Sequence, residues 1–277
     1  MDTLLTIDPG ALADSFGRGP IAVSHRLLDH PLLTVDSIAS LAERLSSDKV
    51  EHNIGDLPTV AAPDAVRQAD MPVGDIARTI ETNGCWMVLK NIEVTSAYKK
   101  LLDETLDEVA AVLGSDDGMT SREGFIFLSA PGSVTPAHTD PEHNFLLQVR
   151  GTKQMNVGRF PDSDTQQLAL EQTLGGGHRN VECEPHDPQT FRLDPGAGVY
   201  VQPHAPHWVK NGPAASVSLS ITFQTQDNQR AIRVHSLNAR LRRLGISPTP
   251  PGQRPALDRL KEACARALAR LRTVFSG

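Results

Sequence analysis

The spacing of hydrophobic residues along the chain changes character near residue 115. Before that point, residues 37–46 follow the capping pair Asp36-Ser37 and carry apolar side chains three and four positions apart, which predicts an amphipathic helix. The run 85–89 follows a helix stop at Asn83-Gly84 and has the length of a buried strand. Residues 96–113 predict a longer helix that Gly114 ends. The first 115 residues are therefore expected to mix helix and strand.

From Gly124 onward, short β-rich runs are separated by Gly, Pro and Asp. In the run 216–223 polar and apolar residues alternate strictly, so one face should meet a core and the other solvent or a polar cavity. Several short strands at this spacing predict a sandwich or barrel, a class that includes jelly rolls and cupins. The runs cover residues 125–128, 145–149, 153–157, 199–201 and 216–223.

After Thr225 the helical spacing returns. Leu237, Leu241 and Leu244 share one face of a helix that Gly245 ends, and a proline-rich loop leads to a last helix. That helix carries a narrow apolar seam, which suits packing against another helix of this domain or of a second copy. The seam consists of Leu257, Leu260, Cys264, Ala267, Leu271 and Val274.

These patterns divide the chain into three regions. Residues 1–115 form a mixed N-terminal region that packs on the core, residues 116–227 form the β core, and residues 228–277 form a helical hairpin. The expected fold is mainly β with flanking helices. The hairpin is a candidate dimerisation element.

Composition limits the class of protein. No run of about 18 apolar residues occurs and the first residues lack a basic, then apolar, leader, so neither membrane insertion nor export is indicated and we expect a cytoplasmic protein. Cys85, Cys183 and Cys264 are scattered, which argues against a disulfide framework or a structural zinc site and indicates reduced packing residues.

Charge is distributed unevenly. Residues 228–277 contain eleven Lys and Arg against two acidic residues, a net charge of +9, whereas residues 1–227 contain 16 basic and 31 acidic residues, a net charge of −15. A basic tail can bind nucleic acid. Exposed helix faces, or a tail that rests on the acidic body of a second subunit, explain it more simply, so we do not expect nucleic acid binding.

The most informative segment contains His138 and Asp140. Residues two apart at a strand end point to the same side, so this imidazole and this carboxylate can meet one ion. A second histidine-bearing strand end follows the turn Asp194-Pro195-Gly196 and offers His207, with His204 as a rival three residues earlier. Two histidines and one carboxylate on one face of an iron ion leave positions open for a 2-oxo acid and dioxygen.

A cosubstrate with two carboxylates also needs a cation for its far end. Lys153 lies fifteen residues after His138 on a returning strand and is the candidate, while Thr135 and Asn144 could supply neutral hydrogen bonds. A lysine at a strand start is more often a solvated charge. Its occurrence together with the three ligand candidates favours a role in binding.

The stretch VTPAHTDPEHNFLLQVRGTK, together with DPGAGVYVQPHAPHW, resembles the Jumonji C (JmjC) hydroxylases, particularly the asparaginyl hydroxylase that inhibits the hypoxia-inducible factor. The resemblance implies a double-stranded β-helix of the cupin or jelly-roll type. It also implies that His138, Asp140 and His207 bind Fe(II), and that Thr135, Asn144 and Lys153 bind 2-oxoglutarate. These three residues match family positions three before, six after and fifteen after the first histidine. The match covers about residues 124–225.

Three positions depart from the family pattern. Ala197 stands where the family usually has Asp, and Gln202 where it usually has Pro; both are expected to affect the turn and the strand rather than the metal. Thr222 replaces an asparagine that contacts the cosubstrate in the asparaginyl hydroxylase, which puts that one contact in doubt.

The remaining histidines of the core have weaker claims. His143 is expected on the substrate side or at the surface. His178 and His186 lie in a Gly- and Pro-rich insertion, residues 175–188, that either covers the active site or is a plain surface loop.

The resemblance implies an Fe(II)- and 2-oxoglutarate-dependent dioxygenase that hydroxylates a protein or peptide side chain and releases succinate and CO2. A small-molecule substrate and demethylation stay open. Two alternatives are a cupin-like regulator or sensor without catalysis, and another metal-dependent cupin enzyme. The latter tends to use more histidines and gives no reason for Lys153.

Overall fold

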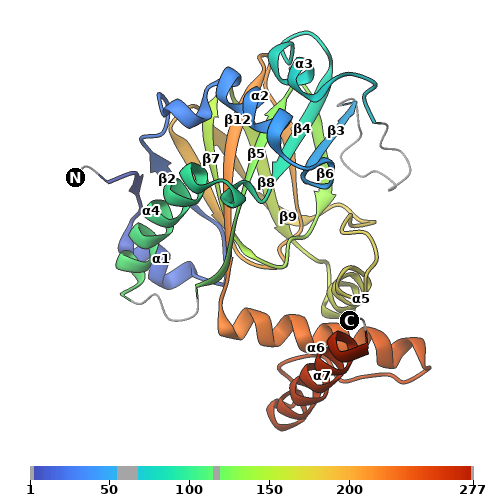
Figure 1. Cartoon of the computed structure of the whole chain (residues 1–277). Helices are drawn as coiled ribbons and strands as arrows, with labels where there is room; N and C mark the ends of the chain where they lie inside the picture. Colours follow the sequence, from blue (N-terminus) through green and yellow to red (C-terminus); the bar gives the residue numbers. More distant parts are fainter. Residues whose placement is uncertain (1–2, 55–67, 115–118, 276–277) are drawn as a thin grey trace.

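The computed structural model describes residues 3–54, 68–114 and 119–275, and side chains as far as residue 270. Twelve strands in this part of the chain form two antiparallel sheets (Figure 1). The eight-stranded sheet has the order β1-β2-β10-β7-β12-β5-β4-β3, and the four-stranded sheet the order β6-β11-β8-β9. None of the described helices is long and apolar enough to cross a membrane.

The strands of the large sheet come from both halves of the chain. They are β1 (Leu5–Thr6), β2 (Ile21–His25), β3 (Val50–Ile54), β4 (Cys85–Lys90), β5 (Thr120–Ser129), β7 (His143–Arg150), β10 (Ala197–Val201) and β12 (Ser216–Gln224). The small sheet contains β6 (Val134–His138), β8 (Lys153–Arg159), β9 (His186–Leu193) and β11 (His207–Asn211).

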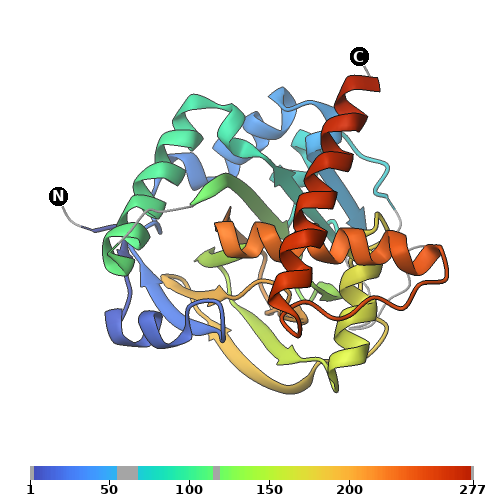
Figure 2. The ribbon, with the colours of Figure 1, turned by 90° about the horizontal axis from the view of Figure 1, so that it is seen from below.

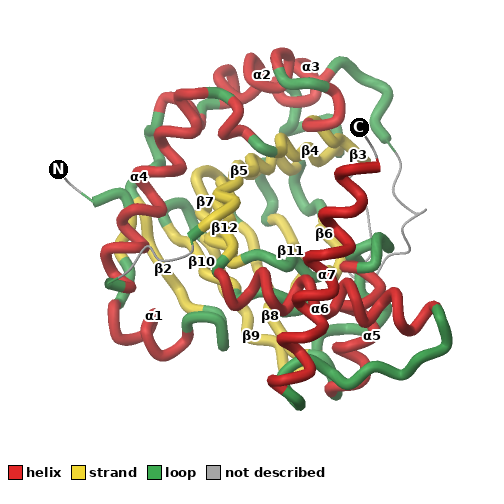
Figure 3. The backbone as a smooth tube through the Cα atoms, turned by 60° about the horizontal axis from the view of Figure 1, so that its bottom comes forward, coloured by secondary structure: helices red, strands yellow, loops and turns green. Residues whose placement is uncertain are grey.

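Helices surround the strands, as the tube in Figure 3 shows. They are α1 (Pro9–Ser15), α2 (Val35–Arg44), α3 (Val73–Arg78), α4 (Ser96–Leu113), α5 (Ser163–Leu174), α6 (Gln226–Arg243) and α7 (Pro255–Phe275). Helices α1 to α4 pack on the outer face of the large sheet. Helices α6 and α7 cross each other below the sheets, beside α5 (Figure 2).

Strand β12 lies at the centre of the large sheet, between β7 and β5, and every residue from Ser216 to Phe223 is buried. Its apolar residues, such as Leu219, belong to the main core with α1 to α4. Its polar residues point the other way, and Ser220 and Thr222 line a cavity between the two sheets. Of the two surroundings expected for the polar face, solvent or a polar cavity, the structure shows the cavity.

Most predicted elements are present. The helix over 96–113 has the predicted bounds and ends at Gly114, whose φ of 72° is the left-handed conformation that glycine adopts readily. The helix predicted over 37–46 begins two residues earlier, because the Thr34 hydroxyl accepts a hydrogen bond from the Ser37 amide and caps it. The prediction of a mainly β fold with two flanking helical regions is confirmed.

The interior of the predicted β region also contains a helix that the periodicity did not reveal. Helix α5 buries only Gln167, Leu170 and Glu171, so its sequence has no apolar stripe. Its N-cap, Asp162, accepts a hydrogen bond from the amide of Thr165 at 2.7 Å. This N-cap residue was the local sequence signal that could have predicted α5.

The proposed division into regions 1–115, 116–227 and 228–277 stays a prediction. Its first boundary falls at residues 115–118, outside the described residues. Strands β1 to β4 of the first region are hydrogen-bonded into the same sheet as the core strands.

The hairpin at the end of the chain is held by ion pairs between its helices. Glu262 of α7 pairs with Arg230 and Arg233 of α6, each at 3.1 Å, and with Arg266 at 2.7 Å. One carboxylate therefore pairs with three of the eleven basic residues of this segment, which keeps its net positive charge.

The three cysteines are free, as expected. Only Cys85 is buried, which agrees with a packing role. Cys183 is partly buried, and Cys264 is exposed on α7, so a packing role for Cys264 within this chain is not seen. The side chains of Leu271 and Val274, part of the expected seam, lie outside the described residues.

Candidate metal and cosubstrate site

Two neighbouring strands of the small sheet bring three ligand-type residues together. His138 ends β6, His207 begins β11, and these two residues are paired directly across the antiparallel strands. The register shifts between His207 and Val209, a bulge of the kind that turns a side chain at the end of a strand. Asp140 follows β6 by two residues.

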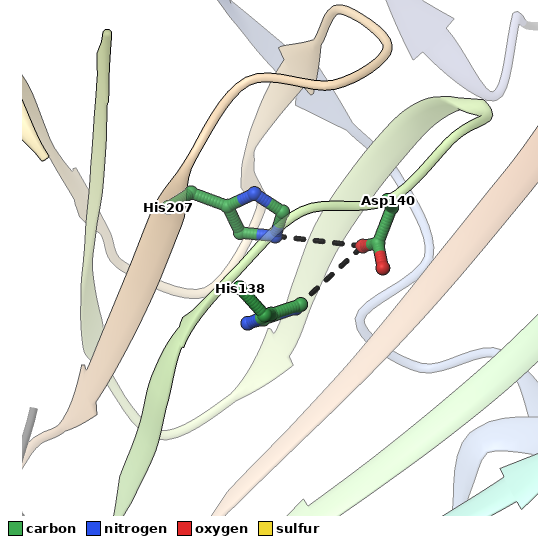
Figure 4. A group of neighbouring side chains, drawn as sticks. All are labelled: His138, Asp140 and His207. Carbon is green, nitrogen blue, oxygen red and sulfur yellow. Dashed lines mark ion pairs between the residues drawn. The ribbon is translucent and has the colours of Figure 1, made fainter. Parts of the chain in front are cut away.

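The three side chains point toward one another (Figure 4). Asp140 Oδ2 lies 3.6 Å from His138 Nε2 and 3.5 Å from His207 Nε2. Their ligand atoms all lie within 4.8 Å of one another, and among the described residues no other group of three His, Cys, Asp or Glu does so. This arrangement fits one metal ion bound by two imidazoles and a carboxylate.

Backbone carbonyls fix the orientation of both imidazoles. His138 Nδ1 lies 2.7 Å from the carbonyl of Pro136, and His207 Nδ1 lies 2.9 Å from that of Ala205. Because a carbonyl oxygen can only accept, each Nδ1 carries the proton and donates it. Each Nε2 is then left with a lone pair directed at the shared centre, as in protein metal sites.

The electrostatics of the site favour the forms that bind a metal ion. Burial, followed by the charge of His207, lowers the pKa of His138 and keeps the ring neutral. Burial alone would raise the pKa of Asp140, but His138, His207 and Arg179 hold it well below its usual range. The carboxylate is therefore ionised at neutral pH.

The site opens into a cavity of about 170 Å³ between the two sheets. Alternate residues of β4, β5, β7 and β12 in the large sheet form one wall. Residues of β6, β8 and β11 in the small sheet form the opposite wall. The wall from the large sheet includes Trp86, Val88, Lys90, Phe125, Phe127, Ser129, Asn144, Leu146, Ser220 and Thr222. The sequence reasoning had not assigned a role to the β4 and β5 residues, although their spacing of two places them on one face.

Lys153 lines this cavity and is almost completely buried, with 4% of its surface exposed. Its ammonium group makes no hydrogen bond or ion pair with any residue in 3–54, 68–114 or 119–270. Burial lowers the pKa of Lys153 to about 7. A buried ammonium group without a protein partner is costly, so an anion is the partner its environment lacks.

The two neutral candidates also line the cavity. Asn144 on β7 is buried, and its Oδ1 accepts a hydrogen bond from Ser220 at 2.8 Å, which leaves its amide hydrogens for a ligand. Thr135 on β6 is half-buried. Thr222 lies opposite Asn144 in the sheet and also faces the cavity.

Two charged residues beside the three ligand-type residues were not singled out by the sequence reasoning. Arg179 belongs to the insertion, lines the cavity and lies 3.1 Å from Asp140 Oδ1. Glu142 also lines the cavity, and burial together with the charge of Asp140 raises its pKa to about 7. Arg179 stands 39 residues from Asp140 in a segment without periodic spacing, so no sequence pattern pointed to it.

His204 lies apart from the three ligand-type residues. Its φ of 65° is left-handed, its amide donates to the Asp140 carbonyl at 2.7 Å, and its ring lies 6.0 Å from that of His235 on α6. This backbone turn directs its side chain toward the helix, away from His138 and His207.

The other histidines differ in their surroundings. His143 is buried, stacks on Phe16 with ring centroids 4.6 Å apart, and its Nδ1 lies 2.8 Å from the Tyr200 hydroxyl. The expectation that it lies on the substrate side or at the surface was wrong, because this aromatic cluster is on the helix-covered face of the large sheet. His178 and His186 are partly or fully exposed and lie outside the cavity wall.

The insertion does cover the site at one edge. The Thr139 amide donates to the Arg179 carbonyl at 3.1 Å, and the Val181 amide to the Ala137 carbonyl at 2.9 Å. Of the two expectations for residues 175–188, a cover and a plain surface loop, the first describes residues 179–181.

Comparison with known proteins identifies the fold. Residues 103–231 match the model of the JmjC domain family. The fold is that of a JmjC domain. The expectation of a cupin-type core is thus confirmed at the level of fold.

Part of the chain is similar to curated relatives of greater length. It is 31% identical over 104 residues to Jumonji C domain-containing protein 5 of Drosophila melanogaster, covering 33% of this chain and 26% of that protein. It is 29% identical over 113 residues to JmjC domain-containing protein D of Dictyostelium discoideum, covering 35% and 25%. The matched segments span about a quarter of the length of these relatives.

Solved structures with the same JmjC fold match nearly the whole chain. Escherichia coli ycfD has a TM-score of 0.56 at 18% identity, over 97% of this chain and 69% of that one. The complex of the ribosomal oxygenase YcfD with cobalt and 2-oxoglutarate has a TM-score of 0.53 at 17% identity, over 96% and 68%. At this identity the likeness concerns the fold.

Proposed function

We propose that the protein is an Fe(II)- and 2-oxoglutarate-dependent dioxygenase that hydroxylates its substrate. The observation that carries this proposal is the position of Lys153, a buried lysine without a protein partner in the same cavity as His138, Asp140 and His207. Three ligand-type residues support a metal site, and the lysine adds the cation that a dicarboxylate cosubstrate requires.

The residues have separate tasks in this proposal. His138, Asp140 and His207 hold Fe(II), which when bound supplies the redox chemistry that activates dioxygen. Lys153 pairs with the C5 carboxylate of 2-oxoglutarate, and Thr135 and Asn144 donate neutral hydrogen bonds to it. The walls of the cavity exclude water and orient the substrate C–H bond toward the metal.

A protein or peptide side chain is the substrate class we favour. The comparison structure carries the name ribosomal oxygenase, and the wall residue Trp86 has a buried indole N–H without a partner among the described residues, available to a substrate group. The narrower resemblance to the asparaginyl hydroxylase has less support, because Thr222 stands at the position of its asparagine. A small-molecule substrate and a non-catalytic regulator are the alternatives.

Succinate production tests the proposal. Purified protein loaded with Fe(II) should convert 2-oxoglutarate to succinate slowly in the absence of a substrate. Asp140→Ala should abolish this turnover, a loss of at least about 100-fold, because one of three ligands and the charge that balances the ion are removed. Succinate is quantified by mass spectrometry.

The matched control is Asp187→Ala, which removes an exposed carboxylate that pairs with Arg159 outside the cavity. This variant should retain wild-type turnover. Equal turnover by wild type and Asp140→Ala would contradict the assignment of the metal site.

We also propose that α7 forms part of a homodimer interface. Leu260 and Leu268 are 59% and 39% exposed on this helix, and Cys264 is exposed between them. An apolar helix face left open on the hairpin suits a second copy better than solvent. Leu260→Glu should convert a dimer to a monomer in sedimentation analysis, and a monomeric wild type would contradict this part.

A further inference from the structure

The carboxylate of Asp140 makes different contacts with its two oxygens. Oδ2 lies 3.5 and 3.6 Å from the Nε2 atoms of His207 and His138, where a shared ion would lie. Oδ1 instead accepts a hydrogen bond from Arg179 Nη1 at 3.1 Å. Oδ2 therefore faces the metal centre, while Oδ1 is hydrogen-bonded to Arg179.

The backbone around Arg179 is fixed to the strand that carries His138. Asn180 forms a β-bridge with His138, and the amides of Thr139 and Val181 make hydrogen bonds across this short ladder. Val181 is 4% exposed and packs with Ala137. The backbone of Arg179 is therefore fixed in place, although its side chain is 51% exposed.

The insertion is also attached at its other end. Arg242 of α6 pairs with Glu171 of α5 at 2.6 Å, and Glu171 is 3% exposed. Arg243 donates a hydrogen bond to the Gly175 carbonyl at 2.6 Å. The segment that carries Arg179 is thus held by β6 on one side and by α5 and α6 on the other.

We propose that Arg179 is a positioning residue that makes Asp140 a ligand through one oxygen only. This inference rests on the proposed function. A carboxylate can bind a metal ion with one oxygen or with two, and a charge-assisted hydrogen bond to Oδ1 opposes the second mode. Single-oxygen binding by Asp140 leaves three of six positions around the ion open.

The open positions matter because the cosubstrate needs two of them and dioxygen a third. When Arg179 is lost, Asp140 can turn Oδ1 toward the ion and occupy a position that 2-oxoglutarate requires. Arg179 also holds the carboxylate in its metal-facing orientation before the ion arrives. Its loss therefore weakens both metal and cosubstrate binding without removing any ligand.

The test uses Arg179→Met, which keeps much of the aliphatic stem and removes the guanidinium. We expect Co(II) affinity to fall about 10- to 100-fold, the range found when a partner of a metal ligand is lost. The visible absorption spectrum of the Co(II) protein should change because the coordination changes. The affinity of the Co(II)-saturated variant for 2-oxoglutarate should fall at least about 10-fold, measured by calorimetry.

Arg179→Lys should recover part of each loss, because lysine keeps the charge but offers no planar pair of donors. The matched control is Arg159→Met, which removes an exposed arginine from the ion pair with Asp187, outside the cavity wall. That variant should bind Co(II) and 2-oxoglutarate as wild type does. Thermal unfolding of all variants shows whether a change reflects loss of structure.

The inference is overturned if folded Arg179→Met matches wild type within twofold in Co(II) affinity, in spectrum and in 2-oxoglutarate affinity. It is also overturned if Arg179→Lys is no better than Arg179→Met, since a packing role would then explain the loss. Failure of the proposed function looks different, because wild-type protein loaded with metal would itself not bind 2-oxoglutarate.

Discussion

The two faces of the large sheet are both buried, yet they differ in chemistry. On the outer face, Leu219 and Ile221 of β12 are completely buried against the helices of the N-terminal half. On the inner face, Ser218 and Ser220 are as deeply buried but hydrogen-bond to Gln148 and Asn144. Burial alone therefore does not mark the apolar core of this protein.

The difference between the two faces reflects their separate roles. Apolar side chains on the outer face stabilise the fold by leaving water. Polar side chains of β12 and β7 on the inner face hydrogen-bond to one another. Lys153 faces the same cavity from β8 of the small sheet, and its ammonium group has no partner among the described residues. The cavity that the inner face lines is consequently not optimised for stability alone, which is expected where a polar ligand binds.

The largest effect is expected for Lys153→Met. It removes the cation from the cavity and should weaken 2-oxoglutarate binding by about 2–5 kcal/mol, or roughly 30-fold or more, while metal affinity is largely kept. The ligand-free protein should become more stable, because Met occupies a similar volume without a charge to bury. Calorimetry and denaturant unfolding measure the two effects.

A substitution that weakens ligand binding and also stabilises the ligand-free protein identifies a residue whose role is to bind the ligand. If Lys153→Met removed the metal instead, the assigned role of the lysine would be wrong. If it lowered the stability of the ligand-free protein, Lys153 would have a structural partner that the account lacks.

Leu219→Ala examines the outer face of the large sheet, at strand β12. A completely buried leucine replaced by alanine should lower the free energy of unfolding by about 3 kcal/mol, from lost burial and the cavity left behind. Binding of 2-oxoglutarate to the folded fraction should change less than twofold. Urea unfolding and calorimetry below the transition check this, and a large loss of affinity without a loss of stability would contradict the division between the faces.

The protonation of Lys153 should make the affinity for 2-oxoglutarate depend on pH. Burial lowers the pKa of Lys153 to about 7, so below pH 7 the ligand-free protein already holds the charged form that pairs with a carboxylate. Above pH 7 binding must first take up a proton, and affinity should fall by up to about tenfold per pH unit.

Calorimetry at pH 8 in buffers of different ionisation enthalpy measures the uptake. Wild type should take up close to one proton on binding, and Lys153→Met should take up less. Equal uptake by the two proteins would assign the dependence to another group.

Ser220→Ala is the smallest change, one residue along the strand from Leu219. It removes the hydrogen bond that holds Asn144 Oδ1 and should weaken 2-oxoglutarate binding by about 1 kcal/mol, or roughly fivefold, as Asn144 turns more freely. A Ser218→Ala control removes a similar bond to Gln148, which does not line the cavity, and should leave this affinity unchanged. Equal effects of the two variants would mean that Asn144 is not involved.

Much of the cavity lining could be predicted from sequence because strand period and motif spacing are local. The run 216–223 revealed both faces of β12, and the spacing of His138, Asp140, Lys153 and His207 indicated a site before any contact was known. Alternation tells which residues share a face, and the end of a strand tells where they meet.

The remaining features depend on contacts between distant segments. Arg179 reaches Asp140 only because residues 179–181 dock on the edge of β6, and nothing in the local sequence of the insertion indicates that pairing. His143 was misassigned because Phe16, which stacks on it, comes from the far N-terminal part of the chain. Such residues are found from the fold, not from periodicity.

Binding of 2-oxoglutarate to the metal-loaded protein tests the central claim most directly. Calorimetry on anaerobic protein saturated with Fe(II) should give one 2-oxoglutarate bound per chain, with binding that needs the metal and is weakened in Lys153→Met. No binding by intact, iron-loaded wild-type protein would contradict the account.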